Sequence, residues 1–386
     1  MIAAPIYLDY CSTTPCDPRV VETMLPHFTR QFGNPASRDH SFGWLAKETV
    51  EQAREQVAAL VQATPREIIF TSGATEAVNL ALKGLAAANP AAGRHIITAA
   101  TEHKAVLDTC DHLEKNGYAT TRLPVDRQGM LSLDELEQAI REDTVCIAIM
   151  YANNETGVIN PVRQIGEIAR KHGICFMCDA TQAVGKIPVS VADAHIDLMA
   201  FSAHKLYGPM GVGALFVRHR RPPVNILQQQ HGGGQERGTR SGTLNTPGIA
   251  GFGKAADICR LEMKEEALRL RQLRDRMETA LLEKIPGAGI NGAGERLPHV
   301  SNIRFPGTDN EQLLLTVSRR LALSRGSACS GIVQQPSHVL QAMGLTGEEA
   351  GNSVRISLGR FTTDNEVDIA VEILTETVRQ LQCINI

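Results

Sequence analysis

Short apolar runs alternate with helical patterns over residues 45–220 of the sequence. The apolar runs predict strands at 67–71, 95–98, 119–124, 145–152, 174–179, 198–202 and 213–217. The segments between them predict helices at 47–62, 74–88, 104–116, 133–142 and 162–172, and Ser132 with Glu135 forms a capping-box pattern before the fourth helix. Such alternation is typical of a mostly parallel sheet covered by helices.

The pattern changes in the last third of the chain. A long charged helical stretch at 249–285 is followed by predicted strands at 299–305 and 354–357 and by predicted helices at 311–321 and 364–382. The sequence therefore predicts an α/β fold with two domains. The large domain, residues 15–258, contains a seven-stranded, mostly parallel sheet, and residues 1–14 and 259–386 form a smaller α+β domain.

Composition and charge narrow the class of protein. The chain has 386 residues, of which 43% are hydrophobic and 21% charged, as in ordinary folded proteins. The formal net charge of −3 gives no reason to expect direct nucleic-acid binding. No apolar run approaches the roughly 20 residues of a membrane span, and the N-terminus lacks signal-peptide features, so we expect a cytoplasmic protein that does not bind a membrane.

The cysteines do not form a disulfide pattern. They number nine, an odd count, and are scattered along the chain. Cys175 and Cys178 have CxxC spacing, but no second pair follows at the spacing of a zinc site, and alternation along a strand would point the two thiols to opposite faces. We therefore expect both to be core cysteines.

Polar residues that could take part in binding or catalysis follow the predicted strands. In open α/β sheets, ligands bind at the carboxyl ends of the strands, so residues at these positions should share one crevice. A small-residue turn at 71–76 opens a helix, where backbone N–H groups and the Thr75 hydroxyl could hold a phosphate. The other strand-end segments are 101–104 (Thr-Glu-His-Lys), 153–155 (Asn-Asn-Glu), 179–182 (Asp-Ala-Thr-Gln) and 202–205 (Ser-Ala-His-Lys).

Each of these residues has an ordinary structural interpretation when taken alone. His103 could be a solvated loop histidine, Asn153 and Asn154 turn residues, Asp179 a helix cap and Lys205 a surface lysine. Together they supply an amine, a carboxylate, a flat ring and hydroxyl donors around one crevice. Pyridoxal phosphate requires this combination, because it needs a lysine, an acid beside its pyridine nitrogen and phosphate donors.

An ordered series of motifs extends over nearly the whole chain. Besides the strand-end segments, it comprises residues 7–10 with 13–15, 32–37, 231–234, 237–243, 326–329 and 357–361. On these motifs the chain resembles the cysteine desulfurases, in the class V branch of the pyridoxal-phosphate aminotransferase-like enzymes. The resemblance implies the fold type I of pyridoxal-phosphate-dependent transferases and a homodimer.

The resemblance also implies roles for individual residues. Lys205 would carry pyridoxal 5'-phosphate as a Schiff base and move protons, and Asp179 would pair with the pyridinium nitrogen. By the same resemblance, His103 would stack on the ring, Gln182 would hydrogen-bond the phenolic oxygen, and Asn154 would position cofactor and substrate. Thr75, Ser202 and His204 would bind the phosphate, and Thr243 would bind the phosphate in the other subunit.

Cys329 is the candidate sulfur acceptor. It lies in a run of mostly small or polar residues, 324–336, which predicts a mobile loop. The resemblance implies that the Cys329 thiolate attacks the sulfur of bound L-cysteine, which leaves a persulfide on Cys329 and releases L-alanine. The loop resembles the long-loop group of the family, whose members transfer the persulfide sulfur to a partner protein.

Besides Asn154, two further residues are implied in substrate binding. Arg355 matches the family's arginine for the substrate carboxylate, which the bidentate guanidinium suits, and Asn34 lies in a motif expected beside the pocket. The alternative for Arg355 is a surface ion pair on a strand face. Gln235 departs from the family, because many relatives have histidine there, and this change is expected to alter the surroundings of the loop.

The sequence leaves the destination of the persulfide sulfur open. The chain stops at Ile386, without the tail that helps many iron–sulfur desulfurases to dock a scaffold, so we expect poor transfer to a general scaffold. Iron–sulfur assembly, tRNA thiolation and DNA phosphorothioation are the candidate destinations of the sulfur. A selenocysteine lyase or class V aminotransferase is the enzymatic alternative, and a non-catalytic sulfur-relay subunit is the other.

Overall fold

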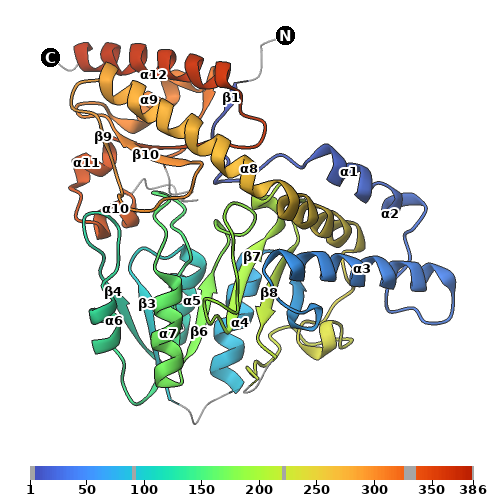
Figure 1. Cartoon of the computed structure of the whole chain (residues 1–386). Coiled ribbons are helices and arrows are strands. Elements are labelled where there is room, and N and C mark those ends of the chain that lie inside the picture. Colours follow the sequence, from blue (N-terminus) through green and yellow to red (C-terminus); the bar gives the residue numbers. More distant parts are fainter. Residues whose placement is uncertain (1–4, 89–92, 220–222, 326–335, 385–386) are drawn as a thin grey trace.

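The computed structural model describes residues 5–88, 93–219, 223–325 and 336–384. Its largest element is a seven-stranded sheet (Figure 1), as predicted. In spatial order the strands are β2 (Ile68–Thr71), β8 (Gly213–Val217), β7 (Leu198–Ser202), β6 (Cys175–Asp179), β5 (Thr144–Ala148), β3 (His95–Ala99) and β4 (Ala119–Leu123). Strand β8 is antiparallel to both of its neighbours, and the other pairings are parallel.

Alternation along the strands separates two hydrophobic cores, one on each face of this sheet. Ile96 and Ile97 are consecutive in β3 but belong to different cores, because successive side chains of a strand point to opposite faces. One face is covered by α4 (Ala74–Ala88) and α5 (Lys104–Glu114). The other is covered by α3 (Ser41–Leu60), α6 (Leu133–Gln138), α7 (Val162–His172) and the first part of α8 (Thr246–Lys284).

Four element boundaries differ from the sequence prediction by four residues or more. Two of them are helix ends: α6 ends at Gln138 rather than at 142, and the helix predicted to end at 321 ends at Val317. Helix α3 begins at Ser41, six residues before the predicted start at 47, because the His40 ring accepts the Gly43 N–H and caps the helix. Strand β5 ends at Ala148 rather than at 152, although the Ile149 and Tyr151 N–H groups still bond to β6 carbonyls. Ser132 caps α6, as predicted, by accepting the Glu135 N–H.

A second α+β core lies beyond the large sheet, at the top of Figure 1. Helix α8 reaches from the first core into this one, where its Leu273, Met277 and Leu281 are buried. The other elements of this part are β9 (Gly289–Ile290), β10 (Val300–Arg304), α9 (Asn310–Val317), β11 (Leu321–Ala322), α10 (His338–Ala342), α11 (Gly347–Gly351), β12 (Ser353–Ser357) and α12 (Asp364–Ile384). The smaller α+β part that the sequence predicts is therefore present.

The N-terminal segment connects the two parts of the molecule. Its strand β1 (Ile6–Tyr7) pairs in parallel with β11, and Leu8 lies in the second core. The chain then crosses to the large sheet, where the Thr14 N–H donates to the His204 carbonyl. Helices α1 (Pro18–Met24) and α2 (Pro26–Thr29) follow along α8, and three short 3-10 turns lie at Pro65–Glu67, Ala203–Lys205 and Glu236–Gly238.

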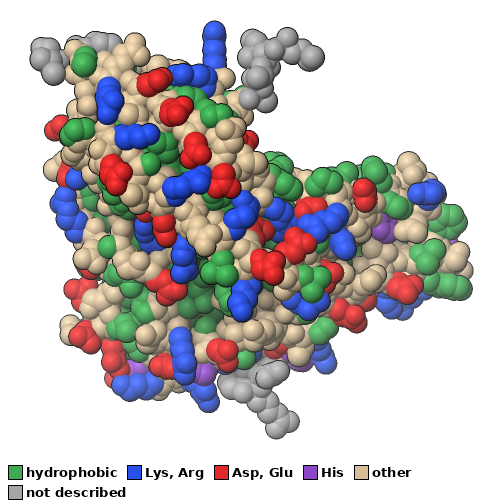
Figure 2. All heavy atoms as spheres, turned by 45° about the horizontal axis from the view of Figure 1, so that its top comes forward, with side chains coloured by type: hydrophobic (Ala, Val, Ile, Leu, Met, Phe, Trp, Pro, Cys, Tyr) green, Lys and Arg blue, Asp and Glu red, His purple; other side chains and the backbone are tan. Residues whose placement is uncertain are grey.

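The surface charges and the cysteines of β6 can be compared with the composition of the chain. Figure 2 shows acidic and basic side chains intermixed over the face that it draws. In the part of the chain that the structure describes, no helix has the length and apolar character needed to cross a membrane. Cys178 is buried and Cys175 is half-buried, and both are free thiols on β6.

Candidate active site

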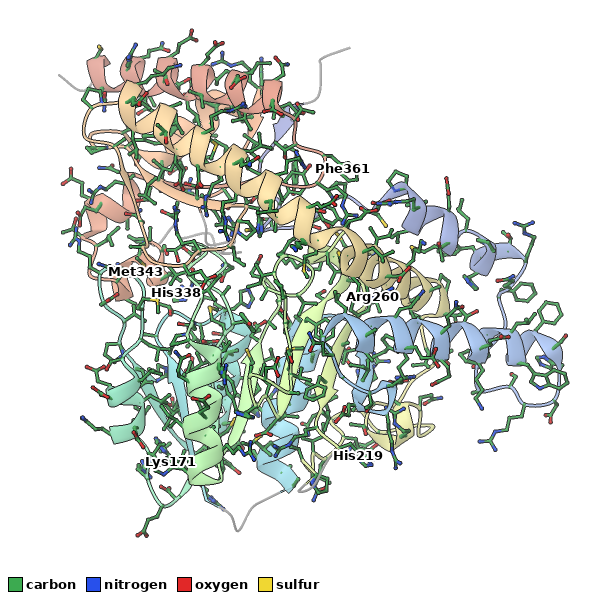
Figure 3. All side chains as sticks on the ribbon, in the orientation of Figure 1. Lys171, His219, Arg260, His338, Met343 and Phe361 are labelled. Carbon is green, nitrogen blue, oxygen red and sulfur yellow. The ribbon has the colours of Figure 1, made fainter. Side chains whose placement is uncertain are left out.

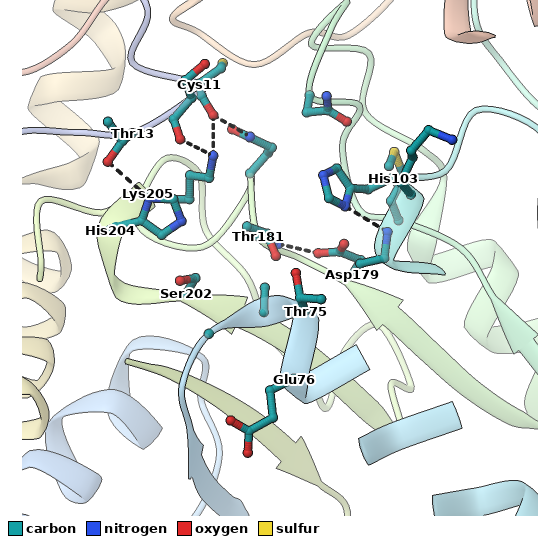
Figure 4. Close-up of a pocket in the computed structure, with 18 of the residues that line it drawn as sticks. Cys11, Thr13, Thr75, Glu76, His103, Asp179, Thr181, Ser202, His204 and Lys205 are labelled. Carbon is teal, nitrogen blue, oxygen red and sulfur yellow. Dashed lines mark hydrogen bonds between the residues drawn. The ribbon is translucent and has the colours of Figure 1, made fainter. Parts of the chain in front are cut away.

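A cavity of about 960 Å³ opens where the strand ends of the large sheet face the N-terminal segment and β12 (Figure 4). Most of the residues predicted from strand ends and from the resemblance line it. They are Thr75, His103, Asn154, Asp179, Gln182, Ser202, His204, Lys205 and Arg355. Residues from every third of the chain thus meet in one cavity, as the strand-end rule predicts for an open α/β sheet.

Lys205 lies in the 3-10 turn that follows β7, with its amine against the N-terminal segment. Its Nζ donates to the carbonyl oxygens of Cys11 at 2.5 Å and Ser12 at 2.6 Å. Burial lowers the pKa of Lys205 to about 8, because it disfavours the charged ammonium. A lysine with this pKa has a usable fraction of neutral amine near pH 7, as a nucleophilic lysine requires. The surface-lysine alternative is therefore wrong.

Asp179 is the last residue of β6, and its side chain is buried. Its Oδ1 accepts the Thr181 N–H at 3.0 Å. The fully buried Glu102 is a nearby acid that the sequence reasoning did not single out, and its Oε1 accepts the Met150 N–H at 2.7 Å. Burial, opposed by that hydrogen bond but assisted by Asp179, raises the pKa of Glu102 well above its usual value. Of these two acids, Asp179 lines the cavity, whereas Glu102 is fully buried and is not part of the lining.

Hydroxyl and imidazole groups gather around the start of α4. Thr75 in the first turn of the helix, Ser202 at the end of β7 and His204 all line the cavity. His204 Nδ1 lies 3.1 Å from Thr13 Oγ1, and burial lowers the pKa of His204 to about 4, so the ring is neutral at pH 7. A helix N-terminus with hydroxyl donors suits a phosphate.

His103 is the N-cap of α5, and its Nδ1 accepts the Ala105 N–H at 3.1 Å. A nitrogen that accepts this bond carries no hydrogen, so the neutral ring has its hydrogen on Nε2. The side chain is exposed to the cavity, where it leaves a ring face open for stacking.

Arg355 lies on β12 and forms the far wall of the cavity. Its Nη2 donates to Asp9 Oδ1 at 2.7 Å and to Ser12 Oγ at 2.9 Å, and its Nη1 donates to the Asn154 carbonyl at 2.8 Å. The side chain is 2% exposed, so the alternative of a surface ion pair is wrong. A buried guanidinium at a cavity wall can recognise a carboxylate.

Two of the predicted residues do not line this cavity, and a third, Cys329, lies outside the described residues. Thr243 and Asn34 are both exposed and do not line the cavity, and Asn34 Oδ1 accepts the Ala36 N–H in its own turn. Gln235, the departure from the family, accepts the Gly242 N–H through Oε1 at 2.8 Å and closes the segment that leads to Thr243.

The sequence reasoning missed the contribution of the N-terminal segment. Residues 7–10 and 13–15 were recognised as motifs, but no role was assigned to Cys11, whose carbonyl accepts both Lys205 Nζ and Gln182 Nε2. His338 was also missed. It lies in Figure 3 between the second core and the sheet, lines the cavity, and has Nε2 3.0 Å from the Glu102 carbonyl oxygen. Main-chain carbonyl roles leave no signal in side-chain identity.

The cavity passes a direct test for a phosphorylated aromatic cofactor. Thr181 Oγ1 is buried and lines the cavity, yet it has no hydrogen-bond partner among the described residues. Buried hydroxyls are normally paired, so this one indicates a missing polar ligand. With Lys205, Asp179 and the donors at the start of α4, the residues present fit pyridoxal phosphate.

Comparison with known proteins agrees with this reading. The family model described as aminotransferase class-V matches residues 6–369. A protein named cysteine desulfurase IscS from Anaeromyxobacter dehalogenans is 50% identical over 379 residues, which cover 98% of this chain and 93% of that protein. The solved structure of a NifS-like protein has a TM-score of 0.91 at 38% identity and covers 97% of this chain and 100% of its own.

A further solved structure, titled SspA in complex with cysteine, has a TM-score of 0.81 at 37% identity and covers 93% of this chain and 100% of its own. The chain therefore belongs to the class-V aminotransferase family of pyridoxal-phosphate-dependent enzymes. Within that family it is a cysteine desulfurase, similar along almost its whole length to the curated IscS proteins.

Proposed function

We propose that the chain converts L-cysteine to L-alanine and leaves the sulfur as a persulfide on Cys329. The observation that carries this proposal is the meeting of Lys205, Asp179 and Arg355 in one cavity. Their groups are an amine with a lowered pKa, a buried carboxylate and a buried guanidinium. Pyridoxal phosphate, when bound, supplies an aldehyde carbon for the substrate amine and a ring that accepts electrons.

Each residue has a defined task in this proposal. Arg355 binds the substrate carboxylate through a guanidinium already oriented by Asp9 and Ser12. Lys205 holds the cofactor and moves a proton at Nζ, and Asp179 keeps the ring nitrogen protonated. Thr75, Ser202 and His204 hold the phosphate, Gln182 and Asn154 lie beside the ring and substrate, and His103 stacks on the ring.

The sulfur transfer balances without an outside oxidant. The Cys329 thiolate supplies the electron pair of the new S–S bond, and the substrate C–S bond breaks. The electron pair of the C–S bond stays on the substrate carbon, which takes a proton and becomes the methyl group of alanine. Sulfur thus reaches the acceptor thiol as a persulfide.

The decisive experiment follows alanine and persulfide together. The wild-type chain should release one alanine per cysteine consumed and carry one persulfide on the peptide containing Cys329. Cys329→Ser should still bind cysteine but form no persulfide. Persulfide on Cys11 or Cys178 in that variant would move the acceptor role, and alanine production only with an added keto-acid partner would favour the class V aminotransferase alternative.

We further propose a homodimer with an aromatic patch in its interface. The patch comprises residues from α2 and the start of α3, namely Phe28, Phe32, Phe42, Trp44 and Leu45. Phe32 and Trp44 are 65% and 58% exposed, an unusual amount of apolar surface for a monomer. Figure 2 shows hydrophobic side chains at the projecting end of the molecule formed by these elements. In this dimer, Thr243 and Asn34 would serve the partner's cavity.

The dimer proposal is tested by the mass of the protein in solution. Trp44→Asp combined with Phe32→Asp should shift the light-scattering mass from twice the chain mass toward 41.8 kDa. Leu315→Asp on α9 is the matched control, because Leu315 is 69% exposed but lies outside the patch. A monomeric wild-type protein, or a dimer unaffected by the patch variant, would contradict the proposal.

The cytoplasmic location, the domain division at residues 14/15 and 258/259 and the sulfur acceptor stay proposals. The candidate acceptors are proteins of iron–sulfur assembly, tRNA thiolation or DNA phosphorothioation. Persulfidated protein offered side by side to an acceptor from each pathway should discharge preferentially to one of them. Release of selenide from selenocysteine without any reaction with cysteine would instead indicate a selenocysteine lyase.

A further inference from the structure

A charged pair, Arg240 with Glu76, lies at the phosphate end of the cavity. Arg240 donates to both oxygens of Glu76, with Nε to Oε1 at 2.7 Å and Nη2 to Oε2 at 3.2 Å. Glu76 Oε2 also accepts the Ser72 N–H at 2.7 Å. Both charged side chains are 18% exposed, so this pair is well shielded from water.

Glu76 stands in the first turn of α4, directly after Thr75, and lines the cavity. A carboxylate there stabilises the helix N-terminus but would repel a phosphate that binds at the same end. In Figure 4, the Glu76 carboxylate points away from the Thr75 and Ser202 hydroxyls. Burial alone would raise the pKa of Glu76, but the hydrogen bonds from Arg240 and Ser72 lower it. Glu76 is therefore an anion, and its charge and the direction of its carboxylate affect a phosphate bound nearby.

The segment that carries Arg240 is itself anchored to the strand leading into this turn. Glu236 accepts Arg54 Nη1 and Nη2 at 2.7 and 2.8 Å and the Phe70 N–H of β2 at 2.8 Å. Glu236 and Arg237 have positive φ angles of 45° and 58°, a conformation that non-glycine residues adopt only when their surroundings enforce it. Arg240 is therefore presented to Glu76 by a rigid support.

We propose that Arg240 is a positioning residue of the phosphate site: it neutralises Glu76 and holds its carboxylate away from the bound phosphate of the cofactor. The inference rests on the proposed function only in requiring pyridoxal phosphate as the ligand. Loss of Arg240 and loss of the Glu76 charge should therefore have different effects on phosphate binding. Removing Arg240 leaves an uncompensated anion near the phosphate, whereas removing the charge of Glu76 does not.

The test compares pyridoxal phosphate with pyridoxal, which lacks the phosphate, on full-length protein stripped of cofactor. Arg240→Gln should weaken pyridoxal phosphate binding by about tenfold or more, as expected for loss of a charge-assisted contact, and pyridoxal binding by less than about twofold. Glu76→Gln should change either affinity by less than about threefold. The double variant should regain most of the affinity lost in Arg240→Gln, because it removes the repelling charge.

The matched control is Arg296→Gln. Arg296 forms an equally two-pronged pair with Glu278, both contacts being 2.8 Å, but it does not line the cavity. Its loss should leave both affinities unchanged, and circular dichroism verifies that every variant is folded. Equal loss of both ligands in Arg240→Gln, or a double variant no better than that single variant, would overturn the inference. A wild-type protein that binds no pyridoxal phosphate would instead overturn the proposed function.

Discussion

The two walls of the cavity are built in different ways. The strand-end wall consists of Thr75, His103, Asp179, Ser202 and Lys205, each at the end of a strand or the start of the following helix or turn. The N-terminal wall consists of residues 11–13 and of Arg355 on β12, which Asp9 holds by a hydrogen bond. The first wall presents side chains in sequence order, and the second joins segments from opposite ends of the chain.

The walls also act through different groups. The strand-end wall offers the amine, the carboxylate and the hydroxyls directly to a ligand. The N-terminal wall binds Lys205 through two main-chain carbonyls and orients Arg355 through Asp9 and Ser12. The first wall therefore supplies the amine, the carboxylate and the hydroxyls, and the second positions the lysine amine and supplies the guanidinium. Substitutions in the first wall should therefore strongly reduce activity. In the second wall, a substitution should matter where the side chain makes the contact and have little effect where the main-chain carbonyl does.

The largest effect is expected on the strand-end wall. Lys205→Ala should reduce alanine release by at least about a thousandfold, since the residue both anchors the cofactor and moves the proton. Borohydride treatment of wild-type protein followed by peptide mapping should place the fixed cofactor on Lys205. Lys104→Ala, which also lines the cavity, should keep this labelling. Cofactor fixed to another lysine would remove Lys205 from its assigned role.

Arg355→Ala tests the side-chain part of the N-terminal wall. Loss of the charge-assisted contact should weaken cysteine binding by about 1.5–3 kcal/mol, or roughly 10- to 150-fold. Cofactor content measured by absorbance should stay the same, because none of the proposed cofactor contacts involves Arg355. A cysteine titration that matches wild type would show that another group binds the carboxylate.

A pH profile tests the protonation state of the Lys205 amine. Because burial lowers the pKa of Lys205 to about 8, cofactor uptake by stripped protein should rise about tenfold per pH unit below pH 8 and level off above it. Between pH 8 and the ordinary lysine pKa of 10.5, the folded chain binds fewer protons than the unfolded chain, so Lys205 contributes stability that increases with pH. An uptake midpoint near 10.5 would contradict the lowered pKa.

The smallest effect is expected from Cys11→Ser. The residue acts on Lys205 and Gln182 through its carbonyl, which the substitution keeps. Burial raises the pKa of the Cys11 thiol, which makes it a poor nucleophile. Turnover should therefore change by less than about twofold in a steady-state alanine assay. A loss as large as that of Lys205→Ala would assign chemistry to the thiol itself.

Much of the strand-end wall could be predicted from local sequence. Short apolar runs locate the strands, and the residues at their carboxyl ends, such as Asp179 of β6, share one edge of the sheet. Element boundaries were predicted less accurately than the elements themselves, because caps such as that of α3 depend on a single side chain, His40. The ordered motifs then indicated the family and the cofactor.

The N-terminal wall was decided by tertiary structure. Arg355 and Asp9 are 346 positions apart, and the crossing of the N-terminal segment to the large sheet brings the carbonyls of Cys11 and Ser12 next to Lys205. Hydrophobic periodicity encodes which face of an element is buried, but not which distant segment covers it. Main-chain carbonyls are common to all residues, so their roles leave no trace in residue identity. The sequence alone thus determined the reacting groups, whereas tertiary burial lowered the pKa of the lysine and the packing of distant segments oriented the arginine.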